Sequence, residues 1–154
     1  MCFSAQASFL AGFGLLASSF YFLRKPIKPE YRLLKLVPIF FGIQQICEGI
    51  VWLTQLNPHY QTVALVARSA FLFFAFFLWP MYIPRALLPL AITPLYKSIQ
   101  TFLYGVGATV GGLLAFLSFK NGISCLISCH HIEYFFTTPS SVSLPLIVCY
   151  CITN

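Results

Sequence analysis

The chain has 154 residues, of which 59% are hydrophobic and only 8% are charged, and its mean hydropathy is +0.85. Soluble domains usually carry about 25% charged residues, so this composition excludes an ordinary soluble domain and predicts an integral membrane protein. The net charge of +6 does not indicate a nucleic-acid partner, because the basic residues gather between apolar runs, as the positive-inside rule describes. We therefore expect the lipid bilayer to be the main partner of the chain. Composition does not specify an oligomeric state.

Four apolar runs are long enough to cross a bilayer as helices, which takes about 20 residues each. A fifth run, 142–153, is well short of that length, so we expect a truncated fifth span. The prediction is an all-α, multi-pass bundle that forms one transmembrane domain over residues 1–154. The four full spans are expected at 3–23, 33–56, 62–83 and 99–119.

The charges between the spans predict the orientation of the bundle. The segment Arg24–Arg32 holds four basic residues and one acidic residue, which places this loop in the cytoplasm and the N-terminus outside. The connection Asn57–Gln61 is short and uncharged, so spans two and three should be antiparallel neighbours that meet at the outer face. Prolines between Pro80 and Pro94 predict that the next inner connection is partly extended rather than helical.

One carboxylate and one guanidinium lie deep inside the second and third spans. Glu48 is 56 − 48 = 8 residues, or roughly 12 Å, from the outer end of its span, and Arg68 is 68 − 62 = 6 residues, or roughly 9 Å, from the outer end of its own. Charges at membrane depth are costly unless they are paired or face a wet cavity. The matching depths predict a Glu48–Arg68 ion pair, with a purely structural role in fixing the register of the spans as the alternative.

Other polar residues are expected at the same outer level. Gln44, Glu48 and Trp52 share one helix face at i, i+4 spacing, while Gln45 lies about 100° away on the helix. The first span begins on the same side of the membrane. We therefore predict an outward-facing polar pocket that binds a small ligand or a lipid head group. Its candidate residues are Cys2, Ser4, Gln44, Gln45, Glu48, Trp52, Arg68 and His131.

Two other functions stay open at the level of the sequence. The first is a membrane-embedded hydrolase or a thiol- or metal-dependent enzyme, in which Cys2 would be the nucleophile, since a nearby positive charge favours a thiolate. A zinc site is the metal-dependent version, although its residues lack the ligand spacing of dedicated zinc sites, and no cofactor is predicted. The second is a purely structural helical interaction module. The zinc candidates are Cys125, Cys129, His130 and His131.

Two stretches carry a resemblance to a known family. The opening Met1-Cys-Phe-Ser-Ala-Gln-Ala-Ser-Phe9 and the helix Phe41-Gly-Ile-Gln-Gln-Ile-Cys-Glu-Gly-Ile-Val-Trp52 resemble an uncharacterised family of bacterial multi-pass membrane proteins. Its members begin MCFSAxASF and carry a QQxxEGxxW helix. The resemblance implies an inner (plasma) membrane protein of unknown function. Because members of that family continue through further spans, we expect this chain to be a shortened copy.

The orientation is tested with reporter fusions to the two most informative loops. A reporter inserted after Lys28 should report the cytoplasm, and one inserted after His59 should report the outside, because the basic loop is retained inside. A cytoplasmic signal at His59 would contradict this orientation.

Overall fold

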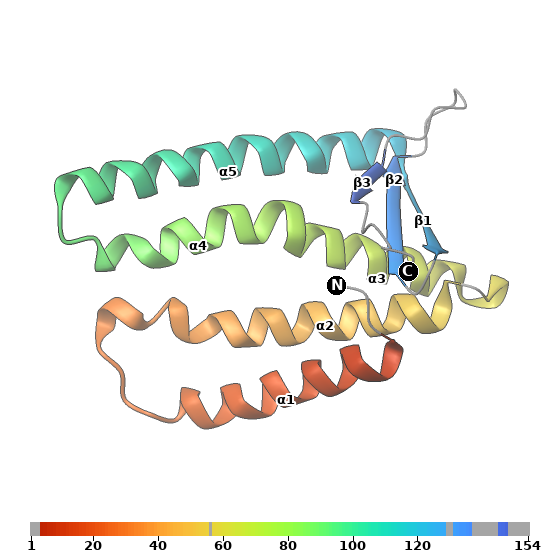
Figure 1. The fold of residues 1–154 in the computed structure, drawn as a ribbon, viewed down its shortest axis with the longest axis horizontal. Coiled ribbons are helices and arrows are strands. Elements are labelled where there is room, and N and C mark those ends of the chain that lie inside the picture. Colours follow the sequence, from red (N-terminus) through yellow and green to blue (C-terminus); the bar gives the residue numbers. More distant parts are fainter. Residues whose placement is uncertain (1–3, 56, 129–130, 137–144, 148–154) are drawn as a thin grey trace, which may run out of the picture.

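The computed structural model describes residues 4–55, 57–128, 131–136 and 145–147, and it is mostly helical (Figure 1). Among these residues, four helical segments are long and apolar enough to cross a membrane, as the sequence predicts. The α-helices are α1 (Ala5–Leu23), α2 (Val37–Thr54), α3 (Gln61–Leu72), α4 (Trp79–Leu87) and α5 (Pro94–Asn121), and short 3₁₀ turns cover Pro29–Tyr31, Leu34–Leu36, Pro58–Tyr60 and Leu88–Leu90.

The helices lie side by side as four rods in the order α1, α2, α3–α4 and α5 (Figure 1). Each rod packs on the one that precedes it in the chain. A small β-sheet stands at one end of the bundle, against α3 and α5. We call this end, where α2 ends and α3 begins, the sheet end.

Small residues bring α1 and α2 into backbone contact. A methyl group added to Gly12 would lie 3.0 Å from the carbonyl oxygen of Gly42, and a methyl group added to Gly42 would lie 3.0 Å from that of Gly12. Ser8 and Ser19 are fully buried along the same helix. Stripes of small residues allow this close approach in apolar surroundings, where packing rather than burial from water holds helices together.

The third rod is longer than predicted. Instead of a partly extended connection after Pro80, the chain stays helical from Gln61 to Leu90. A π-helical segment, Phe73–Leu78, precedes α4, and Pro80 falls in the first turn of α4, where a missing N–H costs little. Pro84 lies inside α4. The expectation that the prolines would end the helix was wrong, because a neighbouring helix covers the backbone carbonyls that both prolines affect.

That neighbour is α5, whose glycines face the carbonyls that the prolines affect. Because Pro80 and Pro84 have no N–H, the carbonyls of Phe76 and Pro80 lack their usual donors four residues on. Gly111 faces the first carbonyl, since a methyl group there would lie 2.6 Å from the oxygen of Phe76, and a methyl group on Gly107 would overlap the oxygen of Pro80. The Cα–H groups of such glycines can make weak contacts with carbonyl oxygens. The i, i+4 spacing of the prolines is thus matched by the i, i+4 spacing of the glycines on the antiparallel helix.

The segment after α5 is a β-sheet, which the all-α prediction missed. The strands are β1 (Ile123–Ser128), β2 (His131–Phe136) and β3 (Pro145–Ile147), antiparallel in the order β1–β2–β3. β3 falls inside the run predicted as a truncated fifth span, and the rest of that run lies outside the described residues. Alternate residues Ile132 and Tyr134 are buried, which is the two-residue period of a strand.

The sheet end has its own small core. Cys125, Ile132 and Tyr134 of the sheet pack on Val51 of α2 and on residues of α3. The ring of Tyr134 stacks on that of Phe71, with centroids 5.5 Å apart and planes 11° apart. β1 and β2 therefore cover the point where the second and third rods meet.

The glycine contact predicts opposite effects for two alanine substitutions on α5. Gly107→Ala should destabilise the bundle by about 1–3 kcal/mol, since the added methyl overlaps the Pro80 carbonyl. Gly105→Ala should be neutral or stabilising by about 0.5–1 kcal/mol, since that position has open space and alanine is the better helix former. Unfolding of both variants in detergent micelles measures this difference. Equal effects would mean that α4 and α5 do not approach at Gly107.

Candidate functional site

Three polar side chains of α2 are buried in the interior of the bundle. Gln44, Gln45 and Glu48 are 7%, 6% and 3% exposed, on a helix that is otherwise mainly apolar. The Gln44 amide oxygen accepts a hydrogen bond from the indole Nε1 of Trp79, at 2.6 Å. The Gln45 amide donates to the Glu48 carboxylate, at 3.0 Å. The polar side chains predicted on α2 are therefore hydrogen-bonded within the protein.

Glu48 and Arg68 do not form the predicted ion pair in the part of the chain that the structure describes. The Glu48 carboxylate accepts from Gln45, whereas the Arg68 guanidinium lies against the thiol of Cys125. Counting residues from the span ends gave the depth of each side chain but not its direction around the helix. The unforeseen sheet also supplied Arg68 with other neighbours. Both charges nevertheless act on the hydroxyl of Tyr134, so they border the same region.

The sheet residues beside Arg68, Cys125 and Tyr134, are joined to the end of α2. The side-chain amide of Gln55 donates to the backbone carbonyl of Cys125, at 2.7 Å. Cys125 is paired with Tyr134 across the β1–β2 ladder. Trp52 packs against the core that contains both. We call Trp52, Gln55, Arg68, Cys125 and Tyr134 the sheet-end cluster.

Four buried polar atoms of this cluster have no hydrogen-bond partner among the described residues. They are Trp52 Nε1, Gln55 Oε1, Arg68 Nε and the Tyr134 hydroxyl. Buried polar groups in folded proteins are nearly always hydrogen-bonded, and leaving one unpaired costs about 1–3 kcal/mol. Such a concentration in one place is therefore unusual and marks the cluster as the candidate site.

The surroundings keep Cys125 and Tyr134 neutral. Burial raises the pKa of the Cys125 thiol, and the nearby Arg68 guanidinium opposes this effect without cancelling it. Burial also raises the pKa of Tyr134 far above its usual range, with smaller contributions from Cys125 and Glu48. Tyr134 therefore remains a hydroxyl that can donate a hydrogen bond, and Cys125 remains a thiol rather than a nucleophilic thiolate.

The other predicted site residues are placed only in part. Ser4 is exposed, and its hydroxyl caps α1 by accepting from the backbone N–H of Ala7, at 3.3 Å. His131 begins β2, but its side chain lies outside the described part of the structure. Cys2, Cys129 and His130 also lie outside it. In the described residues no group of three or more His, Cys, Asp or Glu side chains is arranged to hold a metal.

Sequence reasoning found Trp52 and Arg68 as site residues but missed Gln55 and Tyr134, and it placed Cys125 in a metal site. Gln55 was assigned to the end of a span, and Tyr134 to a loop. The alternation of polar and apolar residues in His131-Ile-Glu-Tyr134 was the available signal for β2, because it is typical of a half-buried strand.

Comparisons with known proteins identify a family and leave the activity of the chain open. No protein of curated function is similar to it, and no solved structure matches it. One family model, described as a family of unknown function, matches residues 1–154. The earlier expectation of an uncharacterised family is thereby confirmed. The chain belongs to this family, DUF6629, along its whole length.

Proposed function

We propose that this chain is a multi-pass membrane protein of the plasma (inner) membrane that binds an anionic group, from a small molecule or a lipid head group, at the sheet-end cluster. With the N-terminus outside, the site lies in the outer leaflet. The observation that carries the proposal is Arg68, a partly buried guanidinium whose Nε is unpartnered and which forms no ion pair with any carboxylate that the structure describes.

The cost of such a cation supports a charged ligand. Burying a charge without a partner is expensive, and a charge at membrane depth normally faces a partner or a wet cavity. A guanidinium binds carboxylate or phosphate through parallel N–H bonds more readily than other side chains do. An anionic ligand group would offset this cost.

The remaining unpartnered atoms support the same ligand class. Trp52 Nε1 can only donate, Arg68 Nε can only donate, and the protonated Tyr134 hydroxyl can donate. Only Gln55 Oε1 is an acceptor without a donor function. A site with three available donors and one acceptor is complementary to the oxygens of a carboxylate or phosphate. An amine or hydroxyl of the ligand would donate a hydrogen bond to Gln55 Oε1.

The hydroxyl of Tyr134 gives the sharpest test, because removing it should have opposite effects on stability and on binding. Tyr134→Phe should leave the stability of the free protein unchanged or raise it, since the deleted group is buried and unpartnered. The same change should weaken anion binding about three- to tenfold, the loss of one hydrogen bond. Binding is measured with two probes: soluble glycerol 3-phosphate, and phosphatidylglycerol in nanodiscs of neutral phosphatidylcholine. Tight binding of only the second probe would identify a lipid head group as the source.

Tyr82→Phe is the matched control. Its hydroxyl donates to the Leu33 carbonyl at 2.7 Å, away from the sheet end. This variant should lose about 1 kcal/mol of stability and keep its affinity for both probes. If Tyr134→Phe destabilises the protein like Tyr82→Phe and leaves binding unchanged, or if neither probe binds the unmodified chain, the proposal is wrong.

A further inference from the structure

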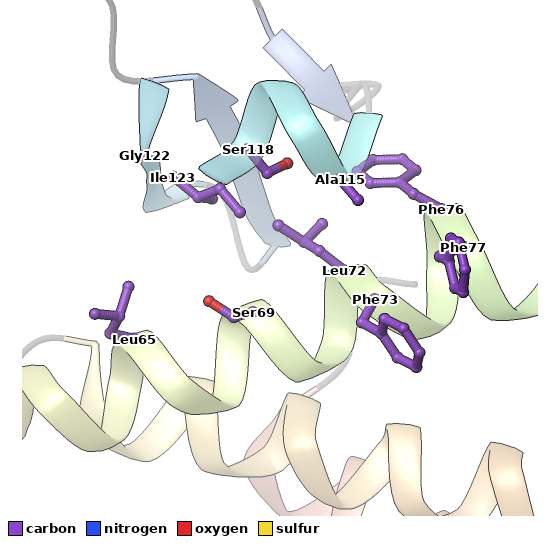
Figure 2. Close-up of a pocket in the computed structure, with 10 residues that line it drawn as sticks. All are labelled: Leu65, Ser69, Leu72, Phe73, Phe76, Phe77, Ala115, Ser118, Gly122 and Ile123. Carbon is purple, nitrogen blue, oxygen red and sulfur yellow. The ribbon is translucent and has the colours of Figure 1, made fainter. Parts of the chain in front are cut away.

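A second site lies on the opposite side of the sheet-end core, between the third rod and α5. Figure 2 shows this cavity, which has a volume of about 430 Å³. Ser69 and Leu72 of α3 and Phe76 of the π-helical segment form one wall, and Ala115 and Ser118 of α5 form the other. A volume of this size is within the range of small-molecule sites, about 300–1,000 Å³.

The cavity begins where the glycine contacts end. Gly107 and Gly111 bring α5 against the third rod, and Ala115 follows at the next i+4 position on the same helix face. Beyond Gly111, the side chains of α5 that line the cavity, Ala115 and Ser118, stay small. Larger residues at these positions of α5 would have filled the cavity, so its presence follows from the small side chains in the sequence.

The π-helical segment Phe73–Leu78 adds an independent observation, because it supplies the aromatic wall of the cavity. Phe73, Phe76 and Phe77 all line it. A π-turn inserts one extra residue into a helix and is found mostly at functional sites. Here Phe76 points toward α5, whereas Phe73 and Phe77 border the cavity from its edge (Figure 2).

The lining predicts a hydrocarbon ligand. None of the described residues that line it has a charged side chain, and two of them, Ser69 and Ser118, carry hydroxyls. The Ser118 hydroxyl donates to the Leu114 carbonyl in its own helix, at 2.7 Å. A water-soluble polar ligand would therefore lose its hydration here without gaining enough hydrogen bonds to replace it.

The surfaces that flank the cavity are apolar and exposed, as expected of helices in contact with lipid. Val66 of α3 is 64% exposed and Phe116 of α5 is 62% exposed. Lys120 is exposed in the last turn of α5, two residues before Gly122, which closes the cavity at the sheet end. A basic side chain at that level is complementary to the phosphate of a lipid whose chain points along the helices.

From these observations we infer that the cavity between the third rod and α5 holds one acyl chain of a phospholipid, with its phosphate beside Lys120. This site is separate from the sheet-end cluster. Leu72, Phe76 and Ile123 lie between the two, because they form the cavity wall on one side and belong to the sheet-end core on the other. Binding of an anion at Arg68 is not required for it.

The proposal is tested by photo-crosslinking the full chain in nanodiscs that contain a phospholipid with a diazirine on its acyl chain. We expect labelling of residues on the facing walls, 65–77 and 115–123. Ala115→Phe should fill the cavity and reduce that labelling about tenfold, which corresponds to about 1.4 kcal/mol of binding. Leu113→Phe is the matched control, because Leu113 is 57% exposed on the same helix, and it should leave labelling unchanged.

If Ala115→Phe fails to fold, Ser69→Leu fills the same space from α3 and should give the same loss. Equal labelling in the filled variants and the control would mean that the lipid only surrounds the helices, and it would overturn the proposal. Crosslinks between two copies of the chain through the cavity walls would overturn it as well, because a second protein would then be the occupant. The Tyr134→Phe measurement has no bearing on this result, so the two proposals can fail independently.

Discussion

A polar group inside an apolar bundle must find its partner within the protein, because lipid offers none, and this constraint organises the structure. Gln44 is bonded to Trp79 across two rods, and Gln45 to Glu48 along one. Gln55 is bonded to the backbone of Cys125, which ties α2 to the sheet. The two bonds between elements, made by Gln44 and Gln55, fix a register that apolar packing alone would leave less defined.

The same constraint acts on the backbone of the third rod. Pro80 and Pro84 deprive two carbonyls of their usual helical donors, and the glycines of α5 approach those carbonyls. In a water-filled environment such carbonyls would simply be hydrated. In an apolar bundle the glycines of α5 pack over these carbonyls, and this contact fixes the position of α5 against the third rod. The cavity then opens where this contact ends.

The sequence predicts the helical part of this structure well and the sheet end poorly. Length and hydropathy identify all four rods, whereas the helix pairs that meet at glycines, α1–α2 and α4–α5, are seen only in the structure. The prolines were misread because their effect depends on Gly107 and Gly111, which lie far away in the chain. Glu48 and Arg68 were placed at the right level but not as a pair, since helix rise fixes depth and says nothing of what a later strand contributes. Tyr134 could be found only once β2 was known to pack on α3.

Among the unpartnered buried groups that the structure describes, Arg68 alone carries a charge, and the proposed anion site depends on it. The chain has two tryptophans, so Trp79→Phe leaves Trp52 of the sheet-end cluster as the sole indole. The most direct measurement is the fluorescence of Trp52 in this variant during titration with phosphatidylglycerol in neutral nanodiscs. Our account predicts a saturable change that disappears when Arg68→Gln is added. A response that is absent, or that is the same with and without Arg68, would contradict it.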